Sequence, residues 1–375
     1  MPRPYSLHKR PTTKPGRFVY YVQFRDEYGN RETAISTGQH SKSAAETWAA
    51  QYANKRTERK DIRFSLFAQD FWDYEKCTYI RGKLARGGSL SHGYADTMRR
   101  YLLKHIMPRF SKYKLTQISP AMIEKWIFLL AKELAPGTVN HCRTCLAIIL
   151  KEAKRLGYLK DNPVDRVNPL VSHPQVKDIL TVKEIKRLFD PSVWKDDILA
   201  YSANLLAATS GMRLGEIRAL MRKHVHTDYI EVLYSFDKYG FQPPKRNSVR
   251  DIPIPRKTSE ALQNIMELTP YPQPEAVVFW TLRGPQAPLS QKGITFPFYR
   301  ALDRIGISQE QRKIRNITFH GHRHFYNTAL RRGKIPDPVI RRLTGHRDEA
   351  MTERYTQFKV SDFQEVLKIQ ETLFS

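Results

Sequence analysis

The spacing of apolar residues changes along the chain, and these changes constrain its fold more than any other feature. Phe18 to Phe24 alternate with a period of two, which predicts a strand, and Thr33 to Thr37 predict a second one. From Phe64 to Ala153 the period is helical, and after residue 178 both periods occur. Because 375 residues exceed what one hydrophobic core usually serves, several domains are expected.

We therefore predict an α+β, mostly helical protein with three domains. A small β-sheet-plus-helix domain covers residues 1–62, a module of four helices covers 63–165, and a mixed α/β domain covers 179–375. Residues 166–178 hold Pro169 and Pro174 without a sustained period, which is typical of a linker. In the third domain we expect helices at 181–190, 195–209, 258–268, 292–306, 321–333, 336–344 and 361–373, and strands near 229–235 and 249–254.

The charge excess runs through the whole chain. Lys and Arg number 63 against 37 Asp and Glu, a net charge of +26, and 1–62, 63–165 and 166–375 carry nets of +6, +9 and +11. A basic surface that serves solubility rarely needs a positive net charge in every part of the chain. Binding of an extended polyanion by several domains explains this distribution. This distribution favours nucleic acid as the partner.

Two segments concentrate this charge. Residues 1–17 have five Lys/Arg, four prolines and no acid, so we predict an arm that stays disordered until it binds DNA. Between Lys76 and Lys114 there are ten Lys/Arg, opposed only by Asp96. In this second segment the predicted DNA-binding residues are Lys76, Arg81, Lys83, Arg86, Arg99, Arg100 and Lys104.

Other classes of protein are excluded by composition. No apolar stretch approaches the ~20 residues that a membrane span needs, and the first residues lack the apolar run of a secretory signal. Three cysteines cannot form a disulfide framework, which favours a reducing cytoplasm. Cys142 and Cys145 have CxxC spacing but lie on the apolar face of a predicted helix, so we expect them in the core.

Four short motifs contain residues suited to chemistry. In Thr209-Ser-Gly-Met-Arg-Leu-Gly-Glu216 one apolar helix ends at Gly211 and another begins, which places Arg213 at a junction with Glu216 available to orient it. The five donors of Arg213 could face one anionic group. The alternative is an ordinary ion pair on a helix surface.

The second motif is Thr318-Phe-His-Gly-His-Arg-His324. On a helix His320, Arg323 and His324 share a face. His320 and His324 have HxxxH spacing, but Gly321 replaces the glutamate of the zinc motif and no acid nearby offers a third ligand. We therefore favour phosphate binding over a metal, and expect no metal site.

The other two motifs are weak alone. Pro243 to Pro255 reads as a β-hairpin with a basic tip at Lys245, which alone indicates a solvated loop. In Leu343-Thr-Gly-His-Arg-Asp-Glu-Ala-Met-Thr-Glu-Arg-Tyr355, His346 lies in a turn after Gly345 and Tyr355 on a following short helix. A lone tyrosine is usually half-buried packing.

Taken together and in this order, the motifs resemble the catalytic signature of the tyrosine recombinases, the phage-type integrases. The resemblance implies catalytic roles for six residues: Arg213, Lys245, His320, Arg323, His346 and Tyr355. It also identifies residues 63–165 as similar to the core-binding domain of that family and 1–62 as similar to the arm-binding domain. His322 departs from the family, which often has leucine there, and it should affect packing because it faces away from His320.

The resemblance implies a mechanism that the chemistry of these residues supports. Two guanidiniums, Arg213 and Arg323, suit the two non-bridging oxygens of an attacked phosphodiester. Tyr355 would be the nucleophile and store the energy of the broken strand in a phosphotyrosine ester, so that neither ATP nor any cofactor is needed. His320 would assist proton transfer, Lys245 would protonate the departing 5′ oxygen and His346 would hydrogen-bond the phosphate.

The expected partners follow from the same resemblance. They are double-stranded DNA at core and arm attachment sites, three further copies of the chain in a homotetramer on that DNA, and possible DNA-bending accessory proteins, with no membrane; the setting would be the cytoplasm and nucleoid of a bacterial host. The C-terminal helix could dock in cis or on a neighbouring subunit. Two alternatives remain: a type IB-like topoisomerase, and a non-catalytic DNA-binding accessory protein.

Overall fold

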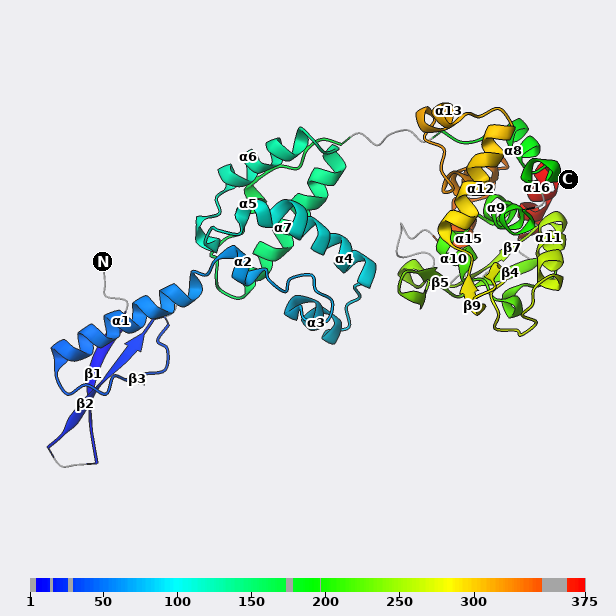
Figure 1. Ribbon diagram of the computed structural model, residues 1–375. Helices are drawn as coiled ribbons and strands as arrows, with labels where there is room; N and C mark the ends of the chain where they lie inside the picture. Colours follow the sequence, from blue (N-terminus) through cyan, green and yellow to red (C-terminus); the bar gives the residue numbers. More distant parts are fainter. Residues whose placement is uncertain are drawn as a thin grey trace. The chain divides into compact units, whose positions relative to one another are not determined.

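The computed structural model describes residues 5–13, 16–25, 30–172, 178–195, 197–345 and 363–374 (Figure 1). The chain divides into two compact units, Met1–His173 and Pro174–Ser375. In the described residues, no helix is both long enough and apolar enough to cross a bilayer. The observed fold is α+β and mostly helical, as predicted.

The first unit begins with a three-stranded antiparallel sheet covered by one helix (Figure 1). Its elements are β1 (Tyr5–Pro11), β2 (Phe18–Phe24), β3 (Ile35–Ser36) and α1 (Lys42–Lys60). Alternation along β2 turns Val22 and Phe24 to the same face, where they form a small core with Ala49 of α1. The strand predicted at Phe18–Phe24 is confirmed.

The prediction that residues 1–17 are disordered is wrong for Tyr5–Pro11. This segment pairs with β2 from Tyr5 opposite Phe24 to Pro11 opposite Phe18. Its charges lie over aromatic rings of β2, with Lys9 Nζ 4.3 Å from the ring centroid of Phe18. Composition failed here because these cation–π contacts and the strand pairing stabilise a basic segment that has little apolar surface.

The rest of the first unit is a helical module with its own core. Its helices are α2 (Phe64–Phe67), α3 (Thr78–Ala85), α4 (His92–Tyr101), α5 (Met107–Phe110), α6 (Pro120–Ala131) and α7 (Pro136–Arg155), with shorter helical turns η1 (Leu102–Ile106), η2 (Leu115–Gln117) and η3 (Pro163–Arg166). The four predicted helices are too few. The helical period that starts at Phe64 corresponds at first to a single turn, α2. The next helix, α3, has only Ile80 fully buried, so the sequence shows no clear helical period there.

Cys142 and Cys145 of this module are buried, which confirms their assignment to the core. Burial raises the pKa of the Cys142 thiol to about 11 and that of Cys145 to about 12. The Cys145 thiol also donates to the carbonyl of Met98 at 3.3 Å. Neither thiol is therefore a reactive thiolate.

The second unit is organised around one buried helix, α9 (Ile198–Ser210), against which α11, α12 and α14 pack (Figure 1). α9 is apolar on nearly every face, which is the pattern of a helix at the centre of a domain. The surrounding helices are α8 (Val182–Leu188), α10 (Leu214–Arg218), α11 (Arg256–Glu267), α12 (Gln291–Arg304), α13 (Gln309–Ile314), α14 (Gly321–Arg332), α15 (Asp337–Thr344) and α16 (Gln364–Phe374), with one-turn helices η4 (Pro191–Trp194), η5 (Arg222–His224) and η6 (Lys245–Asn247).

Three two-stranded antiparallel sheets complete this unit, in the pairs β4–β7, β5–β6 and β8–β9. The strands are β4 (Tyr229–Val232), β5 (Ser235–Asp237), β6 (Gly240–Gln242), β7 (Arg250–Pro253), β8 (Trp280–Thr281) and β9 (Gly284–Pro288). The hairpin predicted over 243–255 is wrong in its pairing. β7 pairs with β4 and not with the segment just before Lys245. The residues between β4 and β7 instead form a hairpin of their own, β5–β6.

The C-terminal helix α16 packs on its own unit. Val366 and Phe374 are buried, and the Phe374 ring lies 5.9 Å from that of Phe189, which follows α8. Gln370 is buried too and donates to the carbonyls of Thr209 and Pro253. The described helix thus docks in cis and contacts the ends of α9 and β7.

Candidate active site

The end of α9 positions the first predicted site residue, Arg213. Gly211 ends the helix in the left-handed conformation, with φ of 64°. A Cβ at this position would lie 2.5 Å from Cδ1 of Tyr326, so only glycine fits. Two residues later Arg213 is the N-cap of α10, and its backbone N–H donates to Glu216 Oε2 at 2.9 Å. The predicted junction of two helices is confirmed.

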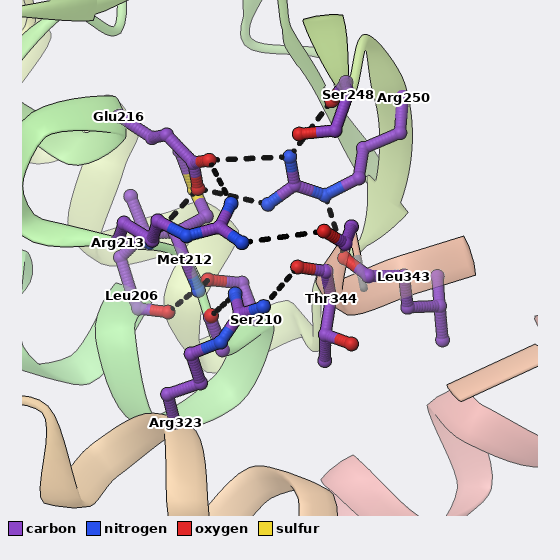
Figure 2. Close-up of polar contacts among 12 residues, drawn as sticks. Leu206, Ser210, Met212, Arg213, Glu216, Ser248, Arg250, Arg323, Leu343 and Thr344 are labelled. Carbon is purple, nitrogen blue, oxygen red and sulfur yellow. Dashed lines mark hydrogen bonds and ion pairs between the residues drawn. The ribbon is translucent and has the colours of Figure 1, made fainter. Parts of the chain in front are cut away.

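Glu216 lies between two arginines (Figure 2). Its side chain is fully buried, and its Oε1 accepts from Arg213 Nη1 at 2.7 Å while its Oε2 accepts from Arg250 Nη2 at 2.8 Å. Burial alone would raise the pKa of this carboxyl, but Arg250 and then Arg213 outweigh burial and hold the pKa below its usual range. Glu216 is therefore an anion that orients Arg213.

Arg323, on α14, lies beside the end of α9 and the end of α15. It is 2% exposed, and its Nη1 donates to the carbonyl of Gly211 at 2.7 Å while its Nη2 donates to that of Thr344 (Figure 2). Burial, followed by the positive charge of Arg213, lowers the pKa of Arg323. The site therefore holds Arg323 and Arg213 close enough to repel one another.

Three arginines hold the carbonyl end of α15. Arg250 donates to the carbonyl of Leu343 at 2.7 Å and Arg323 to that of Thr344. Arg213 Nη2 donates to the carbonyl of the next residue, Gly345, at 3.2 Å. The last carbonyls of a helix lack partners within it and carry partial negative charge, so guanidiniums suit them.

Lys245 and His320 occupy exposed turns of the same unit. Lys245 begins the one-turn helix η6, which follows β6 by two residues and precedes β7. His320 is the N-cap of α14, and its ring centroid lies 4.9 Å from that of His324. Across the described ranges, no group of three His, Cys, Asp or Glu side chains could hold a metal ion.

The last two predicted catalytic residues, His346 and Tyr355, lie outside the described residues. The structure thus joins Arg213 to Glu216 by direct contact, and it holds Arg213 and Arg323 on neighbouring carbonyls at the end of α15. It places Lys245 and His320 on turns adjoining β7 and α14.

Sequence reasoning missed Arg250, although the sequence carries a signal for it. Along Arg250–Pro253 the period of two puts Arg250 on the same side as Ile252, which is fully buried. An arginine at a buried position needs a carboxylate partner, and Glu216 is that partner. His322, by contrast, behaves as predicted: it is buried, and its ring centroid lies 4.6 Å from that of Phe298.

The predicted DNA-contacting residues lie on or next to α3, α4 and η1 of the helical module. Lys76, Arg81, Arg86, Arg100 and Lys104 are exposed, whereas Lys83 and Arg99 are half-buried. Arg99 Nη1 donates to the carbonyl of Phe71 at 3.1 Å. DNA contact by these seven residues stays a prediction.

A helical unit in which two distant arginines converge beside one buried carboxylate has the arrangement expected from the resemblance to the tyrosine recombinases. Solved structures support this fold: a lambda integrase tetramer bound to a Holliday junction covers 91% of this chain and 95% of its own at TM-score 0.59 and 16% identity. The Tn1549 transposon integrase in complex with transposon right end DNA covers 76% and 95% at TM-score 0.59 and 19% identity. Residues 178–361 match the phage integrase family and 86–130 match the phage integrase N-terminal SAM-like domain, so the chain belongs to the phage integrase family.

Two relatives with known sequences agree with this family. The prophage phiRv2 integrase of Mycobacterium tuberculosis is 24% identical over 280 residues, covering 71% of this chain and 72% of that protein. An integrase of Streptomyces ambofaciens is 23% identical over 269 residues, covering 67% of each. The predicted family is confirmed, and the protein is a site-specific recombinase of the integrase type.

Proposed function

We propose that this recombinase cleaves and rejoins DNA through a 3′-phosphotyrosine intermediate in order to integrate or excise a mobile element. The observation that carries the proposal is the convergence of Arg213 and Arg323 at the carbonyl end of α15. These two guanidiniums come from different elements, α10 and α14, and only the fold brings them together.

The charge balance of the site favours an anionic ligand. Arg213, Arg250 and Arg323 are opposed by Glu216 alone among the described carboxylates that contact them. The pKa of Arg323 is lowered first by burial and then by the positive charges of Arg213 and Arg250, which outweigh the opposing effect of Glu216. A DNA phosphate would offset this excess of positive charge, and its two non-bridging oxygens match two planar guanidiniums.

The proposed cleavage step is an in-line displacement at phosphorus. The phenol oxygen of Tyr355 forms a bond to the phosphorus while the bond from phosphorus to the 5′ oxygen breaks. The phenol proton goes to a base, for which His320 is the candidate, and Lys245 gives a proton to the 5′ oxygen. The products are a 3′-phosphotyrosine and a free 5′ hydroxyl, and reversal with another 5′ hydroxyl reseals the strand.

The positions of the two exposed residues are compatible with these roles. His320 lies one turn before Arg323 on α14, so the same helix presents both. Lys245 lies five residues before Arg250 on the turn that leads into β7. His346, directly after Gly345, is proposed to hydrogen-bond the phosphate.

Assembly and location belong to the same proposal. Exchange of four strands needs four active sites, so we infer a homotetramer on DNA, in line with the lambda integrase tetramer bound to a Holliday junction. The sheet domain and the helical module would bind arm and core attachment sites, with accessory proteins that bend the DNA. The setting would be the cytoplasm of a bacterial host, at its nucleoid.

A plasmid carrying two direct copies of an attachment site, to be identified by sequencing the DNA that flanks the gene, tests the proposal. Incubation with the protein should yield recombinant circles of the two expected sizes, and Tyr355→Phe should yield none. Relaxed circles without recombinants would instead indicate a type IB topoisomerase. Bound DNA with no change in any circle would indicate an accessory protein.

A further inference from the structure

Arg250 is a buried arginine that the reaction outlined above does not use. Its side chain is 1% exposed, and each of its three guanidinium nitrogens already donates to an acceptor within the protein, so the guanidinium is occupied by contacts within the protein rather than available to a phosphate. In all, it makes four hydrogen bonds (Figure 2). The acceptors are Glu216 Oε2 at 2.8 Å, Glu216 Oε1 at 3.4 Å, the carbonyl of Leu343 at 2.7 Å and the carbonyl of Ser248 at 3.0 Å.

These acceptors come from three segments, each next to a residue proposed to act on DNA. Glu216 belongs to α10 and contacts Arg213. Ser248 belongs to the turn that Lys245 opens, and Leu343 belongs to the last turn of α15, which leads to His346. One side chain of β7 thus ties together the segments on which the site depends.

The closest coupling runs through the carboxylate of Glu216. Each of its oxygens accepts from both partners: Oε1 from Arg213 Nη1 and Arg250 Nη1, and Oε2 from the backbone N–H of Arg213 and Arg250 Nη2. Without Arg250, this fully buried carboxylate would keep Arg213 as its one remaining cationic partner among the described residues. Arg213 would then be drawn towards Glu216 and away from the phosphate.

The packing around Arg250 leaves little freedom for this arrangement to relax. A Cβ at Gly345 would lie 2.8 Å from Ser248 Oγ and 3.3 Å from Arg250 Nη1, so the end of α15 is in tight contact with the guanidinium. Gly345 has φ of 64°, which also favours glycine. A fork of five donors fits such a fixed set of acceptors, whereas the point charge of a lysine does not.

We propose that Arg250 is a positioning residue of the cleavage reaction, which acts through Glu216 to hold Arg213 in the orientation that binds the scissile phosphate. Arg250 does not contact DNA in this account. The inference rests on the proposed function, because it assigns Arg213 to the phosphate.

The test compares cleavage, DNA binding and folding in Arg250→Gln and Arg250→Lys. The substrate is a nicked duplex carrying the attachment site identified from the flanking DNA, and the readout is single-turnover formation of the covalent protein–DNA adduct. Arg250→Gln should slow adduct formation on the order of 100-fold with little change in Kd for the duplex, and Arg250→Lys should fall between Arg250→Gln and the unmutated protein. Should Arg250→Gln fail to fold, Arg250→Lys carries the test, since it keeps the charge beside Glu216.

Arg315→Gln is the matched control. Arg315 also pairs with a glutamate of the same unit, through Nη1 and Glu184 Oε1 at 2.7 Å, but makes no contact with Glu216. The variant Arg315→Gln should have a lower melting temperature but should form the covalent adduct at the same rate as the unmutated protein. An equal loss of cleavage in Arg315→Gln would show that the effect of Arg250 is one of stability alone.

A double-mutant cycle separates positioning through Glu216 from any other role. If Arg250 acts through Glu216, the variant carrying both Glu216→Gln and Arg250→Gln should cleave no more slowly than Glu216→Gln alone. Losses that multiply, or normal cleavage by Arg250→Gln, would overturn the inference. Absence of any adduct with the unmutated protein would instead refute the proposed function.

Discussion

Arg213 donates from Nη2 to the carbonyl of Gly345 at 3.2 Å, across 132 residues of sequence. Gly345 directly precedes His346, and the proposed nucleophile Tyr355 follows nine residues later. The arginine proposed to bind the phosphate therefore also holds the residue from which the nucleophile segment departs. One hydrogen bond at the end of α15 therefore couples the position of the proposed phosphate-binding arginine to the start of the segment that carries the proposed nucleophile.

Conservative changes at the two proposed phosphate ligands should separate binding from chemistry. Arg213→Lys and Arg323→Lys should each lower the rate of covalent adduct formation by about 100- to 1,000-fold, because one ammonium cannot span two oxygens as a guanidinium does. Quantitative gel analysis of the adduct measures the rate. Arg331→Lys, on the exposed face of α14, is the control and should cleave normally.

Gly211 tests whether the turn before Arg213 is required. Gly211→Ala introduces both an unfavourable positive φ and a contact of 2.5 Å with Tyr326, whereas Gly306→Ala, at φ of 90°, has no heavy atom within 4 Å. Gly306→Ala should cost about 1–2 kcal/mol and Gly211→Ala about 1–3 kcal/mol more. Thermal or urea unfolding measures both; equal losses would mean that the Tyr326 contact relaxes freely.

His322 should make stability depend on mild acid. Its Nε2 lies 3.1 Å from Asn204 Oδ1, and burial lowers the pKa of the imidazole to about 3. Because the unfolded histidine titrates near 6.5, the unfolded state binds the extra proton first, and stability present above pH 6.5 is lost as the pH falls towards 3. The share due to His322 between pH 6.5 and 5 is about 2 kcal/mol.

Replacing this histidine by leucine tests the prediction. His322→Leu should flatten the dependence of the unfolding free energy on pH between 6.5 and 5, even though loss of the Asn204 contact costs about 1–3 kcal/mol at neutral pH. Adduct formation by the folded variant should be unchanged, since the ring points into the core. A slope equal to that of the unmutated protein would rule out a neutral buried His322.

Removal of divalent metal should leave the reaction intact. The guanidiniums and Lys245 are proposed to supply the positive charge that a metal gives in other phosphoryl-transfer enzymes. Adduct formation is therefore measured with and without an excess of chelator. Strong inhibition that added Zn²⁺ reverses would favour a metal at His320 and His324 instead.

The motifs predicted the elements around the site because the start and end of each element depend on residues that are close in sequence. Gly211 ends α9 and Gly345 ends α15, both through a positive φ that a sequence marks with glycine. The helical period likewise placed α14 and thus Arg323. These features depend on residues within a few positions of one another.

What the sequence did not predict depends on contacts between distant segments. The pairing of β7 with β4 is not visible from the residues around Lys245, because it joins strands separated by the β5–β6 hairpin. Arg250 was missed since its partner, Glu216, lies 34 residues away. Tyr5–Pro11 is a strand because β2 supplies both its hydrogen bonds and the rings beneath its charges.

Mapping the covalent bond between protein and DNA tests the central claim most directly. The adduct formed with the attachment-site duplex is denatured and digested with a protease, and the DNA-linked peptide is identified by mass spectrometry. The account predicts a phosphodiester that joins the phenol oxygen of Tyr355 to the 3′ end of the cleaved DNA strand. It also predicts no adduct from Tyr355→Phe. A linkage at any other residue, or an adduct that survives in Tyr355→Phe, would contradict it.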